Sequence, residues 1–268
     1  MQVPRMCVIA LAWNAHPRWR LLLIGNRDEA HARPSAALSH WDDKPIIGGR
    51  DLEAGGTWLG VTGDGRCSVV TNVRNPGDPQ QGLSRGLLVS DYLEGSDRAA
   101  EHAEKLRRAA AGYRPFNLLI FDASQAFHIG NRPGPRAQRL SAGVHGLSNA
   151  ELDTPWPKTQ QLCERLQRWI DAGQGQAKAP DFGPLFAALA DEQPAPDARL
   201  PDTGVGLELE RKLSPAFIRG ESYGTRASTV VAIDHDGGGV IIERRFGPNG
   251  RLDGQNLLAI EEPRLAAG

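Results

Sequence analysis

Residues 6–29 read MCVIALAWNAHPRWRLLLIGNRDE, two apolar runs separated by a polar connection. The runs at 7–13 and 21–26 have the length of strands, and the connection at 14–20 contains Pro17, which favours a loop. This pattern predicts an antiparallel hairpin at the start of the chain. The charged run at 27–34 ends in Pro34 and is unsuited to a central strand, so the second strand is expected to end at Asn26.

Further along the chain, the same reasoning predicts three more pairs of strands, at 57–61 with 67–73, 116–121 with 126–130, and 228–234 with 240–246. Turn sequences TGDG at 62–65 and DGGG at 236–239 join the first and the last of these pairs. Helices are expected at 84–93, 96–111, 159–170 and 182–189, and loops at 75–79, 173–180 and 191–203. The tail after Pro248 is weakly patterned.

The strands bracket the helices, without the alternation of strand and helix that a doubly wound parallel sheet requires. An α+β fold of antiparallel sheets covered by helices is therefore predicted. No sharp break in composition divides the chain, so residues 6–268 are expected to form one domain.

The composition excludes several classes of protein. The chain has 268 residues with 31 Lys+Arg against 32 Asp+Glu, and 40% of its residues are hydrophobic. Such a chain can fill a core, and its near-zero net charge gives no footprint for nucleic acid. Apolar runs fall short of a membrane span, and no signal peptide is evident. Three cysteines cannot all pair, which favours a reducing, cytoplasmic location. The oligomeric state stays open.

Common catalytic motifs are missing, including the Gly-x-Ser-x-Gly elbow, the phosphate-binding loop, zinc-ligand spacing and Cys-x-x-Cys. What remains are Asn, Arg and Asp residues at predicted strand ends, where several segments can converge on one cleft. An Asn amide can donate to an oxyanion, and an Arg can hold a carboxylate. The four segments are 26–29 (NRDE), 71–75 (TNVRN), 147–149 (LSN) and 223–226 (YGTR).

Cys7 directly follows a second methionine, Met6. If translation starts at Met6 and this residue is removed, Cys7 carries a free α-amine, whose ordinary pKa is ~7.7–8.0. That amine can take the proton of its own thiol, so no histidine partner is needed. Residues 1–5 are then a leader or a mis-assigned start. The alternative is that Cys7 is a buried strand residue, as Cys67 and Cys163 are expected to be core residues.

The sequence resembles the NRDE-motif family, also called the transport and Golgi organisation family. The resemblance rests on short motifs that occur in the same order as in the family and lie between Met6 and Phe246. They are MC at 6–7, NRDE at 26–29, GGTW at 55–58, TNVRNP at 71–76, GLSN at 146–149 and YGTR at 223–226. This family resembles the N-terminal nucleophile hydrolases, which implies a four-layer αββα sandwich. The most similar branch contains penicillin V acylase and choloylglycine hydrolase and cleaves linear amides with an N-terminal cysteine.

The resemblance implies a role for each matching residue. Cys7 corresponds to the nucleophile, Asp28 to the acid that orients its amine, and Arg27 lies beside that acid. Asn72 and Asn149 are similar to the oxyanion-side and amine-side asparagines, and Arg226 to the late arginine near the thiolate. The hydrolases read Gly-Arg-Asn-x-Asp where this chain reads GNRDE at 25–29, so Asp28 or Glu29 could be the equivalent acid.

Two functions follow as expectations. The first is a cysteine hydrolase that cleaves a linear amide of a small molecule and needs no cofactor. The second is a non-catalytic intracellular carrier of haem or of an amphipathic ligand such as an acyl-CoA, since members of the family are connected with haem handling and with lipid metabolism. Residues 26–29 could instead be a solvated turn, and Asn72 and Asn149 could satisfy turn backbone. Arg226 is expected to need a carboxylate partner, Asp28 or Glu29.

Overall fold

The structure, a computed structural model, describes residues 6–74 and 82–261. The predicted leader at 1–5 and the predicted loop at 75–79 lie outside the described residues. One antiparallel sheet has six strands in the order β10-β1-β2-β11-β12-β13. Its strands are β10 (Gly143–Leu147), β1 (Met6–Trp13), β2 (Trp19–Ala30), β11 (Tyr223–Asp234), β12 (Gly239–Phe246) and β13 (Leu252–Ile260).

The second sheet is also antiparallel and has seven strands, β3 to β9, which are neighbours in the order of the sequence. Its strands are β3 (Ser35–His40), β4 (Ile47–Asp51), β5 (Leu59–Val61), β6 (Cys67–Asn72), β7 (Phe116–Phe121), β8 (Ala126–Gly130) and β9 (Arg136–Arg139).

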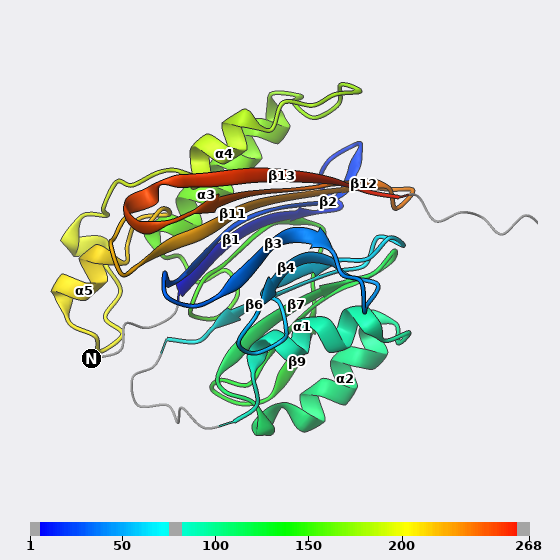
Figure 1. Cartoon of the computed structure of the whole chain (residues 1–268), viewed down its shortest axis with the longest axis horizontal. Coiled ribbons are helices and arrows are strands. Elements are labelled where there is room, and N and C mark those ends of the chain that lie inside the picture. Colours follow the sequence, from blue (N-terminus) through cyan, green and yellow to red (C-terminus); the bar gives the residue numbers. More distant parts are fainter. Residues whose placement is uncertain (1–5, 75–81, 262–268) are drawn as a thin grey trace, which may run out of the picture.

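Helices cover the outer face of each sheet (Figure 1). α3 (Pro157–Asp171) and α4 (Gly183–Leu189) pack on the six-stranded sheet, while α1 (Arg85–Glu94) and α2 (Ala99–Ala109) pack on the seven-stranded sheet. A short helix, α5 (Leu207–Lys212), lies near the start of β1, and single 3-10 turns are at Ala110–Gly112, Asp197–Arg199 and Pro248–Gly250. The predicted αββα sandwich is confirmed.

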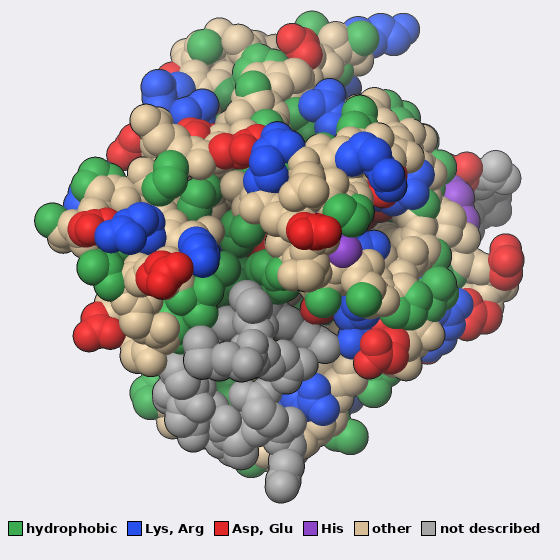
Figure 2. Space-filling view, turned by 60° about the vertical axis from the view of Figure 1, so that its left-hand side comes forward, with side chains coloured by type: hydrophobic (Ala, Val, Ile, Leu, Met, Phe, Trp, Pro, Cys, Tyr) green, Lys and Arg blue, Asp and Glu red, His purple; other side chains and the backbone are tan. Residues whose placement is uncertain are grey.

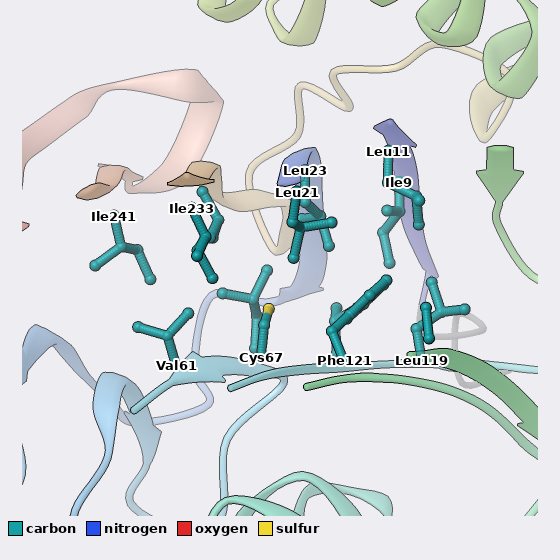
Figure 3. Close-up of a cluster of buried hydrophobic side chains, with 14 of the residues drawn as sticks. Ile9, Leu11, Leu21, Leu23, Val61, Cys67, Leu119, Phe121, Ile233 and Ile241 are labelled. Carbon is teal, nitrogen blue, oxygen red and sulfur yellow. The ribbon is translucent and has the colours of Figure 1, made fainter. Parts of the chain in front are cut away.

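The alternation of side chains along β1 explains why this strand lies between two apolar layers. Successive residues of a strand point to opposite faces. Ile9 and Leu11 join the core between the two sheets, whereas Val8 and Ala10 pack under the helices. Figure 3 shows side chains of both sheets pointing toward one another in the inter-sheet core, with Cys67 among them. A strand buried on both faces accounts for the continuous apolar run.

The structure corrects several sequence-based expectations. β2 does not end at Asn26 but continues to Ala30, so the residues 26–29 belong to a central strand. The weakly patterned tail contains β13, and β3, β4, β9 and β10 were not predicted. β3, β9 and β13 are edge strands with many exposed polar residues, which weakens the period-2 signal. The strands predicted at 116–121 and 126–130 are confirmed with the same bounds.

The paired glycines before Trp58 bring two backbones together. Gly55 has a φ of +77°, and a Cβ on Gly56 would lie 2.4 Å from the backbone carbonyl of Gly86 at the start of α1. We therefore expect Gly56→Ala to lower the free energy of unfolding by about 1–3 kcal/mol, because two backbones must separate. Urea denaturation measures this. Gly63→Ala is the control, since a Cβ there meets nothing within 4 Å; equal losses in both variants would contradict the close-approach argument.

Candidate active site

Cys7 and Arg27 lie side by side at the end of the inter-sheet core. β1 pairs with β2 so that Cys7 is opposite Arg27 and Met6 is opposite Asp28. Residues directly opposite each other in an antiparallel pair project to the same face. Cys7 follows the parity of Ile9 and Leu11, so its thiol and the Arg27 side chain face the space between the sheets. The apolar core gives way at this point to a charged cavity.

The cavity brings together residues from both sheets and from the start of α1. Of the six predicted site residues, five line it, and Asn149 does not. The structure brings three of the four strand-end segments to this cavity. Half of all the lining residues are charged: the arginines are Arg27, Arg33, Arg50, Arg85, Arg114, Arg226 and Arg245, and the acids are Asp28, Glu29, Asp51, Glu243 and Asp253.

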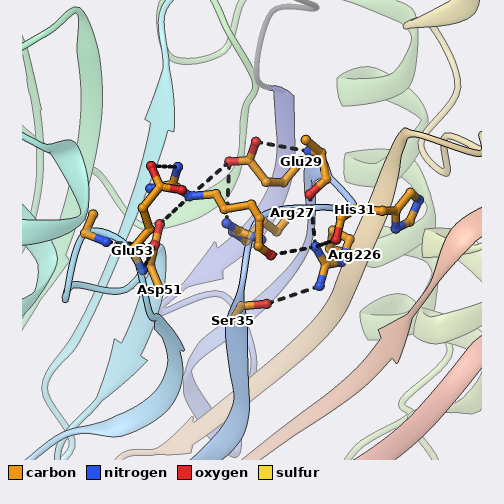
Figure 4. Close-up of polar contacts among 10 residues, drawn as sticks. Arg27, Glu29, His31, Ser35, Asp51, Glu53 and Arg226 are labelled. Atoms are coloured by element: carbon orange, nitrogen blue, oxygen red, sulfur yellow. Dashed lines mark hydrogen bonds and ion pairs between the residues drawn. The ribbon is translucent and has the colours of Figure 1, made fainter.

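Ion pairs organise one wall of the cavity (Figure 4). Arg33 pairs with Asp51 at 2.8 Å and lies 3.8 Å from Glu29. Arg27 pairs with Glu29 at 3.5 Å, so Glu29 lies between two arginines. The second of the two candidate acids is thus tied into this wall, on the same face as Arg27.

Arg226 holds the segment that follows β2. β2 and β11 pair with a register shift between Thr225 and Ala227, which makes Arg226 the extra residue of a β-bulge. Its guanidinium donates to the backbone carbonyls of Ala30, His31 and Arg33 at 3.0–3.1 Å. In the described chain no hydrogen bond or ion pair joins Arg226 to the expected partner, Asp28 or Glu29, and Glu29 acts on Arg226 only through its charge. Arg226 fixes the chain at the cavity rim (Figure 4).

Asp28 is a buried carboxylate with one free acceptor atom. It is 2% exposed, and its Oδ1 accepts a hydrogen bond from the Thr225 hydroxyl at 2.7 Å. Its Oδ2 has no hydrogen-bond partner among the described residues. Burial raises the pKa of the Asp28 carboxyl to about 7, against the opposing charges of Lys158 and Arg27. A buried acceptor without a partner is costly, which marks this atom as a candidate contact for a ligand or a modified terminus.

Asn149 supports the site from behind instead of lining the cavity. Its amide donates to the backbone carbonyl of Asn72 at 2.8 Å, and the neighbouring Ser148 hydroxyl donates to the Cys7 carbonyl at 2.7 Å. Thr71 donates to the Ser148 carbonyl at 2.6 Å. The segment 148–149 therefore ties β6 of one sheet to β1 of the other. Asn72 itself is among the residues that line the cavity.

The thiol of Cys7 is poorly ionised where it lies. Burial raises the pKa of Cys7 to about 12, the nearby Asp28 adds to the rise, and Arg27 opposes it. A thiol in this state keeps its proton at neutral pH and becomes nucleophilic only if a neighbouring base removes that proton.

Sequence reasoning missed three further buried polar residues at this site. Lys158, in the first turn of α3, is 3% exposed and Glu243, on β12, is 5% exposed. Thr225 belongs to the quoted segment 223–226 and could have been singled out there. Glu243 directly follows the apolar run at 240–242 and precedes Arg244 and Arg245, so in the sequence it is only the first of three charged residues. Nothing in the sequence distinguishes Lys158 from an ordinary exposed lysine, because its burial depends on tertiary packing.

The described ranges 6–74 and 82–261 contain no group of three or more His, Cys, Asp or Glu side chains placed to hold a metal ion. No helix there has the length and hydrophobicity needed to cross a membrane. Basic and acidic side chains are interspersed on the face shown in Figure 2, without a field of one sign. Such a surface lacks the basic stripe typical of proteins that bind nucleic acids.

Comparison with known sequences gives a consistent result. The sequence model of the family described as Transport and Golgi organisation 2 matches residues 6–248. The human Transport and Golgi organization protein 2 homolog is 34% identical over 260 residues, covering 89% of this chain and 92% of that protein. Transport and Golgi organization protein 2 of Drosophila melanogaster is 26% identical, covering 86% of this chain and 89% of that protein.

Among solved structures, a mutant conjugated bile acid hydrolase from Clostridium perfringens is similar with a TM-score of 0.50 and 9% sequence identity. The match covers 94% of this chain and 92% of that chain. At this identity the likeness shows the fold alone: the chain shares the αββα architecture of the N-terminal nucleophile hydrolases.

Proposed function

The chain belongs to the Transport and Golgi organisation 2 family, and from this premise we propose that it is a hydrolase whose N-terminal cysteine, Cys7, cleaves the linear amide bond of a small molecule. The observation that carries the proposal is the position of the Cys7 thiol. It lines a charged cavity directly beside Arg27, with Asn72 on the facing sheet, in a fold shared with hydrolases.

The elevated pKa of the Cys7 thiol sets the first chemical requirement. A base must take the thiol proton, and no histidine is among the residues that line the cavity in the described chain. A free α-amine on Cys7 satisfies this requirement, since its ordinary pKa of ~7.7–8.0 leaves it partly unprotonated at neutral pH. The proton moves from sulfur to nitrogen, and the thiolate attacks the carbonyl carbon of the substrate.

The remaining steps use groups that surround the thiol. The amide of Asn72 donates to the oxyanion of the tetrahedral intermediate, as preorganised donors do in acyl transfer. The α-ammonium returns its proton to the departing nitrogen as the carbon–nitrogen bond breaks. Water then hydrolyses the thioester. In this scheme Asp28, with its free Oδ2, orients the amine. Asn149 positions Asn72, and Arg226 positions the cavity rim.

The proposal requires that the residues before Cys7 are removed. The described chain includes Met6, which is fully buried against Leu213 and Ile218. The Cys7 nitrogen therefore belongs to the peptide bond between Met6 and Cys7. An amide nitrogen is not a base. The maturation state of the N-terminus therefore decides between an active and an inactive protein.

We expect protein that begins at Cys7 to be acylated at that thiol by an electrophilic amide or lactone, and protein that keeps residues 1–6 to react at least ~10³-fold more slowly, because it lacks the base. Intact mass followed by peptide mapping reads out the acylation site and separates Cys7 from Cys67 and Cys163. Equal rates for the two forms would contradict the amine-assisted mechanism.

The same preparations test the rival function, a non-catalytic carrier of haem or an acyl-CoA-type ligand. The carrier function would be supported, and the hydrolase excluded, by two results together: a haem absorption band that persists in Cys7→Ala, and no turnover of amides by protein that begins at Cys7. Turnover that disappears in Cys7→Ala supports the hydrolase.

A further inference from the structure

Two buried groups of opposite charge lie near the start of β1. Asp28 is opposite Met6 in the strand pairing, and Lys158, in the first turn of α3, is close enough to interact with Asp28 and Cys7 through its charge. Both side chains are almost fully buried, at 2% and 3% exposure. Buried charges are rare unless they serve one another or a ligand, so this arrangement calls for a reason.

Within the described chain Lys158 and Asp28 form no hydrogen bond or ion pair with each other, although the charge of each shifts the pKa of the other. Lys158 Nζ donates to the carbonyl of Leu213 at 3.1 Å. Asp28 Oδ1 is occupied by Thr225, while Oδ2 has no partner in the described residues. Asp28 nevertheless opposes the fall in the pKa of Lys158 that burial causes. Lys158 therefore acts on Asp28 through its field and leaves Oδ2 open.

The position of Lys158 is not explained by helix formation. A cation in the first turn faces the positive end of the helix dipole, which is unfavourable. The charged and titratable groups around Lys158 and its partner come from every neighbouring element: Asp28, Arg27 and Glu29 on β2, Cys7 on β1, Tyr223 on β11, Arg74 after β6 and Glu210 on α5. Arg74 and Glu210 pair with each other, which leaves Lys158 as the counter-charge of Asp28.

We propose that Lys158 is a positioning residue of the hydrolase site, whose buried ammonium keeps Asp28 charged and prevents that carboxylate from trapping the α-amine of Cys7 as an ammonium. This inference rests on the proposed function, since it needs Cys7 to be the first residue.

The role of Lys158 follows from the net charge of a buried triad, formed by Asp28, Lys158 and the α-amine of Cys7. A carboxylate alone beside an amine stabilises the protonated amine, which cannot accept the thiol proton. With Lys158 present, carboxylate, ammonium and neutral amine sum to zero, and a further proton would leave a net positive charge in a dry site. Lys158 also stabilises the Cys7 thiolate. Both effects favour proton transfer from Cys7 sulfur to Cys7 nitrogen, and no other reactant takes part.

The test uses otherwise whole protein that begins at Cys7, alkylated by iodoacetamide over a range of pH and mapped by mass spectrometry. Lys158→Met should move the midpoint of Cys7 alkylation upward by about one pH unit, which is tenfold slower reaction near neutral pH. Lys158→Arg keeps the charge and should restore most of the rate. Lys105→Met removes an exposed lysine that pairs with Asp97 and should leave the midpoint unchanged.

A second variant, in which the opposite charge is removed, should shift the midpoint of Cys7 alkylation in the opposite direction. Asp28→Asn removes the negative charge with little change of shape, and should move the same midpoint downward. A charge effect moves the two midpoints in opposite directions, whereas general disruption of the site would slow Cys7 alkylation in both variants. An unchanged midpoint in Lys158→Met, or a Lys158→Met protein that fails to fold together with no downward shift in Asp28→Asn, overturns the inference. If unmodified protein beginning at Cys7 neither alkylates at Cys7 nor turns over amides, the proposed function itself fails.

Discussion

Replacing Cys7 with alanine in protein that begins at this residue is expected to lower kcat/KM for an amide substrate by ~10⁴-fold or more. Removal of a nucleophile leaves only the contribution of binding and of the oxyanion donors. Cys7 is 7% exposed and the change removes a single sulfur atom, so the fold should be retained. Turnover of a panel of small N-acyl amides, with the thermal midpoint as a check on folding, measures the effect.

Cys7→Ser is the matched control for this experiment. It keeps the α-amine and nearly the size of the side chain but offers a hydroxyl, which needs more activation than a thiol. We expect turnover between that of the unmodified protein and that of Cys7→Ala. A Cys7→Ala protein with undiminished turnover would show that another group attacks the substrate.

Replacing Glu210 with glutamine should lower the free energy of unfolding by about 3–5 kcal/mol, the usual result of leaving a buried charge without its partner. Arg74 and Glu210 form an ion pair whose two side chains are each 3% exposed. Arg74 also stacks on Trp156 at 4.7 Å, so its guanidinium cannot turn outward to water without losing that contact. Chemical denaturation gives the free energy.

The same helix supplies the control. Glu208 pairs with Lys212 across one turn of α5, but both side chains are largely exposed. Glu208→Gln should therefore leave the free energy of unfolding nearly unchanged. Equal losses from Glu208→Gln and Glu210→Gln would mean that burial does not govern the pair. The double change Arg74→Met with Glu210→Leu should recover much of the loss, because it removes both charges.

The sequence was most informative where a strand is buried on both faces. The runs that became β1, β7 and β8 are mostly apolar and were recognised for that reason. The end of β2 was misjudged because the fold accommodates its charged residues: Arg27 and Glu29 pair with each other in the cavity, and Asp28, which also lines the cavity, accepts a hydrogen bond from Thr225. A charged cavity between two sheets permits polar residues in a central strand, and no local pattern announces such a cavity.

The candidate site was foreseen to a similar extent. The segments that contain Cys7, Arg27, Asn72 and Arg226 could be recognised from their residue types, and the structure brings these four residues to one cavity. Which face each side chain takes depends on strand register and on the bulge at Arg226, and these arise from pairing between distant parts of the chain. For the same reason Asn149 was expected in the site and lies behind it.

The buried Met6 side chain carries a consequence for the evolution of this protein. Met6 fills an apolar site beside Leu213 and Ile218, and its loss would leave an unfilled volume of the kind that costs about 2–5 kcal/mol. The form with a free Cys7 amine is therefore the less stable of the two. In the proposed mechanism, selection for catalysis and selection for a stable fold therefore oppose each other at this one residue. Substitutions that raise stability elsewhere in the chain would widen the range of sequences in which a form beginning at Cys7 persists.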